Sequence, residues 1–103
     1  MAAEIPTYDK TPSELLDFSV DWTEWLAGPD GTLTDTINSS SWLFPTTPDT
    51  ALVDDHDDNS DKVITKWVSG GTVGRVYVLT NSIVTVADRH ASRTIKIYIV
   101  ATR

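Results

Sequence analysis

Apolar and polar residues alternate along several segments of this chain, first over residues 16–22. Apolar side chains at positions 16, 18, 20 and 22 alternate with polar ones at 17, 19 and 21. A period of two is typical of a β-strand with one face in a core and the other in water. Similar patterns predict strands at residues 51–53, 62–68, 75–86 and 94–102.

Turn-forming residues separate these segments. The run Gly28-Pro29-Asp30-Gly31 and the glycines at 70, 71 and 74 predict tight turns. Residues 23–27 leave the alternating pattern and fit one helical turn or a corner, and residues 54–61 are expected to form a polar, acidic loop. Short strands at this spacing, divided by turn residues, predict an all-β, immunoglobulin-like antiparallel β-sandwich, an architecture of roughly seven strands in about 100 residues. The cysteine pair of antibody domains is absent, so the prediction is of the general sandwich.

The first thirteen residues differ from the rest. Pro6 and Pro12 disfavour a helix, and Ile5 and Tyr8 are the only large apolar side chains between Met1 and residue 13. We therefore expect residues 1–13 to be an N-terminal arm and residues 14–103 to be a single domain. The arm is either a loose chain end or an extended segment that lies on a neighbouring subunit.

The two predicted strands at 75–86 and 94–102 are apolar on both faces. One face of this hairpin carries Tyr77, Leu79 and Ile83 with the isoleucines at 95, 97 and 99. A free sandwich needs only one dry face per sheet, so the second apolar face predicts a contact with another subunit or with the arm. Alternatively, valine simply suits an exposed strand. The predicted partner-binding residues are Ile5, Tyr8, Val76, Val78, Val84, Val86, Tyr98 and Val100.

Charge and composition narrow the classes of partner. The formal net charge is -7 and the pI is about 4.4, which disfavours nucleic acid and anionic membranes and suits a basic protein surface. The chain has no cysteine, which excludes disulfides and thiol chemistry. It shows neither a signal-peptide pattern nor an apolar run of membrane-spanning length, so we expect it to stay in the cytoplasm where it is made.

The acidic segment offers a weak calcium candidate. Asp55, Asp57, Asn59 and Asp61 stand at alternate positions, as in the first half of a calcium-binding loop. Ser60 replaces the glycine of such a loop, and Lys66 replaces its final glutamate. A solvated connection is therefore the favoured interpretation, and no metal is assigned.

No catalytic or cofactor motif is recognisable. His56 and His90 lie in separate polar segments, and neither a nucleophile elbow nor a phosphate-binding loop is present. We therefore expect a protein without enzymatic activity and without a cofactor.

Four tryptophans are many for 103 residues. Trp22 and Trp67 are in phase with predicted core positions, whereas Trp25 and Trp42 flank loops. Core packing is the favoured role for all four, but exposed indoles at 25 or 42 would suit a carbohydrate-binding module. Asn81 interrupts an apolar strand face and is predicted to be a buried, hydrogen-bonded amide at a bulge.

Five segments, in this order, resemble a known family. They are Asp21-Trp22-x-x-Trp25-Leu26, Ser41-Trp42, Trp67-Val68-Ser69-Gly70-Gly71-Thr72-x-Gly74, Tyr77-x-Leu79-x-Asn81 and Ala87-Asp88-Arg89-x-x-x-Arg93-Thr94-Ile95-x-Ile97. The pattern resembles small immunoglobulin-like virion proteins of tailed bacteriophages, often labelled tail fibre or fibre-like. The similarity covers roughly residues 15–100.

The resemblance implies a structural protein of the virion, assembled in the host cytoplasm. Our first expectation is a decoration or cement protein that binds the major capsid protein on the head, as a homo-oligomer such as a trimer. The alternative is a tail or tail-fibre component bound to other virion proteins. A carbohydrate-binding module is the main alternative outside this class.

Overall fold

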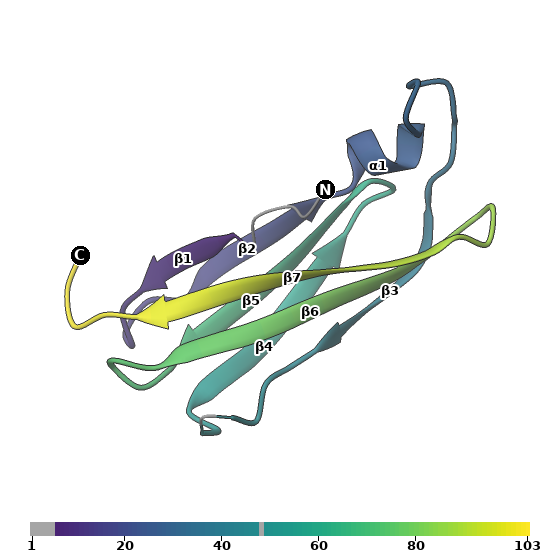
Figure 1. Ribbon diagram of the computed structural model, residues 1–103. Helices are drawn as coiled ribbons and strands as arrows, with labels where there is room; N and C mark the ends of the chain where they lie inside the picture. Colours follow the sequence, from purple (N-terminus) through teal and green to yellow (C-terminus); the bar gives the residue numbers. More distant parts are fainter. Residues whose placement is uncertain (1–5, 48) are drawn as a thin grey trace.

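The structure is a computed structural model, and it describes residues 6–47 and 49–103. Two β-sheets face each other (Figure 1): a larger sheet with the strand order β1-β7-β6-β3, and a smaller sheet with the order β2-β5-β4. All neighbouring strands are antiparallel except the pair β1 and β7, which is parallel. The predicted all-β, immunoglobulin-like sandwich is therefore confirmed. The elements are β1 (Thr7–Lys10), β2 (Leu16–Asp21), α1 (Thr23–Ala27), β3 (Ile37–Leu43), β4 (Leu52–Asn59), β5 (Val63–Gly70), β6 (Val76–Thr85) and β7 (His90–Ile99).

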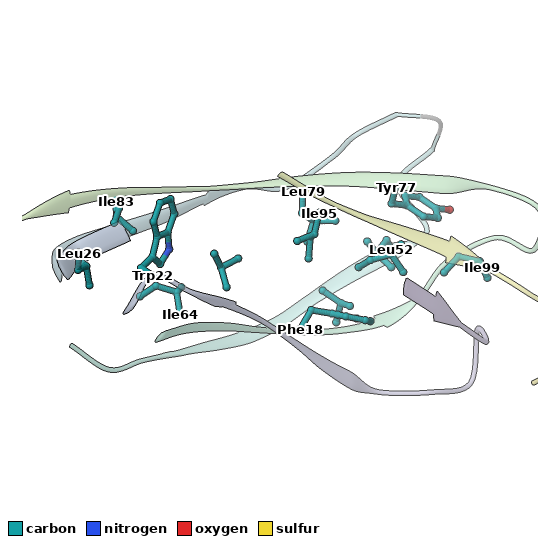
Figure 2. Close-up of a cluster of buried hydrophobic side chains, with 13 residues drawn as sticks. Phe18, Trp22, Leu26, Leu52, Ile64, Tyr77, Leu79, Ile83, Ile95 and Ile99 are labelled. Carbon is teal, nitrogen blue, oxygen red and sulfur yellow. The ribbon is translucent and has the colours of Figure 1, made fainter. Parts of the chain in front are cut away.

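The alternation in the sequence decides which side chains enter the core. Odd-numbered residues of β6 and β7 point inward, and they meet even-numbered residues of β2 and β5 from the opposite sheet (Figure 2). Burying these apolar surfaces is the main favourable contribution to folding. The core comprises Phe18, Val20, Trp22, Leu26, Leu52, Ile64, Val68, Tyr77, Leu79, Ile83, Ile95, Ile97 and Ile99.

A buried hydrogen bond joins the two sheets. Trp22, directly after β2, donates from Nε1 to Oδ1 of Asn81 on β6 over 2.9 Å. The amide of Asn81 in turn donates to the carbonyl oxygen of Ser41 on β3 over 3.0 Å. Asn81 is therefore buried and hydrogen-bonded as predicted. The predicted bulge is not at this residue, because the register shift of β3 against β6 lies between Ile37 and Ser39.

The other end of the sandwich is fixed around Tyr77. Its hydroxyl donates to Oδ1 of Asp49 over 2.6 Å and accepts from the backbone N–H of Thr72 over 2.9 Å. A tyrosine near the start of a strand that bonds to backbone a few residues upstream is similar to the tyrosine corner of immunoglobulin domains. Gly70 has a φ of 74°, and a Cβ there would lie 2.5 Å from the carbonyl oxygen of Ala51. This turn therefore requires glycine.

The acidic segment is a strand, not the predicted loop. β4 runs through Asn59 and pairs with β5 along its length, with a register shift between Asp54 and His56. The short helix α1 confirms the first of the two alternatives for residues 23–27. The part of β4 beyond the predicted strand at 51–53 lacks alternating apolar residues because its side chains are exposed, so periodicity could not reveal it. Backbone pairing with β5 supplies the strand instead.

Trp67 was predicted to lie in the core, and this prediction is wrong. The even-numbered residues of β5 face inward, and they include Lys66, which is buried. Its Nζ lies 2.5 Å from Oδ1 of Asp54 and 5.8 Å from the centre of the Phe44 ring. This pairing compensates the charge at a core position. Trp67 therefore lies half-buried on the outer face of the smaller sheet, where it stacks on His56 at 5.2 Å.

Part of the predicted arm belongs to the larger sheet. β1 pairs with β7, and the ring of Tyr8 lies 5.1 Å from that of Phe18. Lys10 is buried and donates to the carbonyl oxygens of Thr11 and Gly70 over 2.8 and 2.7 Å. Residues 7–10 therefore pack on their own domain. Ile5 lies outside the described residues.

We predict that Asn81→Leu lowers the free energy of unfolding by about 2–4 kcal/mol, because Trp22 Nε1 and the Ser41 carbonyl oxygen would lose their buried partner. Urea unfolding measures this change. The control is Ser82→Ala on the outer face of the same strand, which removes only an exposed hydrogen bond to Ser92. We expect a change below about 1 kcal/mol for this control. Equal stability of the two variants would contradict the bridging role of Asn81.

Candidate partner-binding surface

Two of the segments that carry the family resemblance, residues 21–26 and 87–97, build the scaffold at one end of the sandwich. The guanidinium of Arg89 lies 4.3 Å from the centre of the Trp25 ring, and it bonds to Asp35 Oδ2 and the Leu26 carbonyl oxygen, each over 3.0 Å. These contacts tie the β6–β7 turn to α1 and to the loop before β3. Arginine suits this position because its planar group can stack and hydrogen-bond at the same time.

A second arginine repeats the arrangement next to it. Arg93 of β7 lies over the ring of Trp22 at 4.4 Å and donates from Nη1 to the carbonyl oxygen of Asp21 over 2.9 Å. The rings of Trp22 and Trp25 meet edge to face at 5.5 Å. The Asp21-Trp22-x-x-Trp25-Leu26 segment and the segment with Arg89 and Arg93 therefore form one structural cluster.

The tryptophans do not form the exposed platform that a carbohydrate-binding module would need. Trp25 and Trp42 are half-buried and pack against the core. Trp25 is also covered by Arg89. The indole nearest to an outer sheet face is Trp67, and His56 stacks on it.

An apolar surface lies on the outer face of the larger sheet, at the end near the start of β6. Val76 and Tyr98 pair directly across β6 and β7, and Leu43 of β3 contributes the most exposed side chain. We call this surface the outer apolar patch. Its members and exposed fractions are Leu43 (72%), Val76 (38%), Val78 (43%) and Tyr98 (40%).

The outer apolar patch continues into a shallow groove beside β3. The groove has a volume of about 460 Å³ and is lined by Leu43, Phe44, Pro45, Val76 and Val78, with threonines 46 and 47 at its margin. Grooves with apolar walls on a soluble protein are typical contact sites for another chain. The groove is therefore a candidate contact site for a segment of another protein.

The predicted apolar face is not continuous along the hairpin. Hydroxyl pairs cross its middle: Thr80 lies 3.1 Å from Thr94, and Ser82 lies 2.8 Å from Ser92. Val86 is exposed and Val84 half-buried beyond this hydroxyl band.

Of the seven predicted partner-binding residues that the structure describes, three come together in the patch: Val76, Val78 and Tyr98. Tyr8 faces the core side, paired with Ile97, and Val100 is half-buried after the end of β7.

Leu43 was missed by the sequence analysis. The run Trp42-Leu43-Phe44 is apolar at every position, so its period does not tell which side chain faces outward. The structure places Trp42 opposite the inward Asn81 and Leu43 opposite the outward Thr80.

Negative charge gathers on the edge of the smaller sheet. β4 carries aspartates 54, 55, 57 and 58, all of them exposed. Asp54 pairs with Lys66, and Asp55 pairs with His56. Since the segment is an extended strand, the weak calcium candidates Asp55, Asp57 and Asn59 do not curl around a common centre, and Asp61 lies beyond the end of the strand. In the part of the chain that the structure describes, no three His, Asp or Glu side chains form a metal-sized cluster.

Comparison with known proteins identifies the family. Residues 10–98 match the model of the Gp77 family, described as podophage GP4 fiber-tail adaptor protein gp77. The chain belongs to this family. The predicted resemblance to tailed-phage virion proteins is therefore confirmed. No curated protein matches the chain.

One solved structure has a similar outline. It is the solution structure of the PKD domain from the KIAA 1837 protein, with a TM-score of 0.47 and 14% sequence identity. The match covers 100% of this chain and 88% of that one.

Membership of the Gp77 family makes the chain a structural, tail-related protein of a phage virion. The family match favours our alternative, a tail component, over head decoration, for which it gives no support. No helix among residues 6–47 and 49–103 is long and apolar enough to cross a membrane.

We predict that acid weakens the fold through Glu14. The hydrogen bonds from the Arg103 guanidinium hold the pKa of Glu14 at about 2, against an ordinary value of 4.5. Because the pKa of Glu14 is lowered, the stability that its bonds to Arg103 contribute is complete above pH 4.5 and is lost as the pH falls through about 2. Melting curves of Glu14→Gln should show a lower Tm than the native chain near pH 7, and a smaller fall in Tm across the acid window. Parallel curves for both proteins would contradict this assignment.

Proposed function

We propose that this chain is a non-enzymatic adaptor in a podophage-type tail, where it holds a fibre on the tail through protein–protein contacts. The observation that carries the proposal is the match to the fiber-tail adaptor family over residues 10–98. The structure supports it in a second way. Most residues that carry the family resemblance make contacts within the two ends of the sandwich, which leaves the outer face of the larger sheet and the sheet edges available for binding.

The outer apolar patch is the surface that we assign to one of these contacts. Its side chains already lie in a fixed sheet, so little conformational entropy is lost when a partner covers them. Leu43 is the most exposed of them and stands next to the groove. Truncating or charging a central side chain of such a patch weakens binding more than changes at its rim.

We predict that Val78→Asp reduces the amount of this protein in assembled particles at least about tenfold, because a carboxylate would be buried without a partner in the contact. The measurement is quantitative mass spectrometry of purified particles. Electron cryomicroscopy of native particles locates the domain. Density at the junction of tail and fibre is the expected result, and density spread over the head shell would overturn the adaptor proposal in favour of decoration.

The matched control is Val53→Asp. Val53 is a similarly exposed valine, at 50%, but it lies on β4 of the smaller sheet. We expect normal incorporation of this variant. If both variants were lost equally from particles while retaining native melting curves, the outer apolar patch would not be the contact.

A further inference from the structure

The four edge strands of the sandwich differ in charge. β1 and β3 border the larger sheet, and β2 and β4 border the smaller one (Figure 1). β1 has four residues, two of them charged, and β2 carries two aspartates. β4 carries four aspartates. β3, with the sequence Ile-Asn-Ser-Ser-Ser-Trp-Leu, is the one edge strand of the described chain without a charged or proline residue.

Charges, prolines and short length are the usual protection of sheet edges against pairing with another chain. β3 has none of these along its seven residues. One protecting feature is present, since the register shift between Ile37 and Ser39 bends the first part of the strand. The regular part that remains open is Ser39–Leu43.

The backbone of this part has unused hydrogen-bonding groups. Beyond its ladder with β6, the described residues supply it with one further hydrogen bond, from the side-chain amide of Asn81 to the carbonyl oxygen of Ser41. In a strand, alternate N–H and C=O groups point away from the paired neighbour. The groups that point away from β6 are therefore free to pair with an added strand.

The surroundings of β3 differ on its two sides. On the outer side lie Leu43 and the groove beside Val76 and Val78. On the core side, the nearest edge of the smaller sheet is β4. Lys66 of the adjacent strand β5 lies over the ring of Phe44, the residue that directly follows β3.

Two aspartates of β4 point to this core side. In the ladder between β4 and β5, Asp54 lies opposite Val68 and Asp57 lies opposite Lys66. Both of these β5 residues face inward. Paired residues of an antiparallel ladder share a face of the sheet. The two aspartates are nevertheless exposed. They therefore lie at the open lateral margin of the sandwich, where the larger sheet does not cover them.

We propose that β3 binds an extended, basic segment of another virion protein as an additional strand of the larger sheet. Alternate side chains of an added strand point to opposite faces. Its outward side chains are apolar and continue the outer apolar patch beside Leu43. Its inward side chains are Lys or Arg, and they extend over β4 toward Asp57 and its neighbours. Backbone pairing supplies affinity in such strand addition, and the alternating side chains supply specificity.

A second copy of this chain is the less suitable occupant. Antiparallel pairing of β3 with β3 of a second copy brings the two acidic β4 strands together on the same side of the joined sheet. Each chain also carries a formal net charge of -7. Like charges brought together in this way oppose association, whereas a basic segment is attracted.

This inference does not require the adaptor function, because it is argued from the strand edge, the outer apolar patch beside it and the charges. The first test uses synthetic seven-residue peptides, the length of β3, added to the purified full chain. A peptide of alternating Val and Lys should bind at least about tenfold more tightly than one of alternating Val and Glu. Binding should weaken as salt is raised. Hydrogen exchange should slow at residues 39–43.

Two controls separate strand addition from general attraction of a basic peptide to an acidic protein. A Val-Lys peptide with N-methyl groups on alternate residues keeps its charge but cannot donate backbone hydrogen bonds from the methylated edge. It should therefore lose binding to β3. Asp57→Asn should weaken binding several-fold, whereas Asp58→Asn, on the opposite face of β4, should not. The proposal is overturned if the N-methylated peptide binds equally well, if the two variants behave alike, or if no peptide binds.

The second test uses assembled particles. The chain has no cysteine, so Ser41→Cys introduces a single thiol on the edge strand. A photoactivatable crosslinker attached to this thiol, which does not depend on a lysine at this face, should then join the chain to a different virion protein, identified by mass spectrometry. The control Ser92→Cys places the thiol on the same sheet face but on the interior strand β7. Crosslinks only between copies of this chain, or equal partner crosslinks from both positions, would overturn the proposal.

Discussion

The indole of Trp22 lies between the two sheets, and its hydrogen bond to Asn81 determines how they are arranged. The donor lies just after β2 of the smaller sheet, and the acceptor lies on β6 of the larger one. Because Asn81 also holds Ser41, the same amide fixes the position of β3. A buried amide with both ends satisfied allows one register only, since a shift by one residue would leave each partner unpaired in the core. Which face of β3 and β6 points outward follows from this register.

The contacts around Trp22 also explain why the family resemblance says little about the binding surface. At one end of the sandwich, Arg89 stacks on Trp25 and Arg93 stacks on Trp22, and the two indole rings meet edge to face. Both arginines also donate to backbone carbonyl oxygens. Gly70 and Tyr77 fix the opposite end. These residues form a stable frame, and their side chains make their stacking contacts and hydrogen bonds within it. Leu43, Val76 and Tyr98, which remain available, lie outside this frame on the outer sheet face.

Periodicity predicted those elements in which burial alternates. β2, β6 and β7 have one apolar face in the core, and their inward residues could be assigned from the sequence. β5 misled the prediction because Lys66 occupies an inward position and Trp67 an outward one. Lysine is tolerated there through its pairing with Asp54, a contact that no local pattern contains. β4 was predicted only at its start, within residues 51–53, since the rest of this exposed edge strand is held by backbone pairing and not by its side chains.

The contrast between β3 and β4 connects the fold with assembly. Both strands border the same side of the sandwich, yet one has no charge and the other has four aspartates. An uncharged edge alone would favour pairing between copies of the chain, which is the first step of aggregation. The acidic strand beside it opposes that pairing through charge repulsion, while the bulge at the start of β3 limits the open edge to a few residues. The same two features leave the edge accessible to a segment that brings the opposite charge. A chain that must remain unpaired before assembly and bind within the particle can meet both demands with this one arrangement.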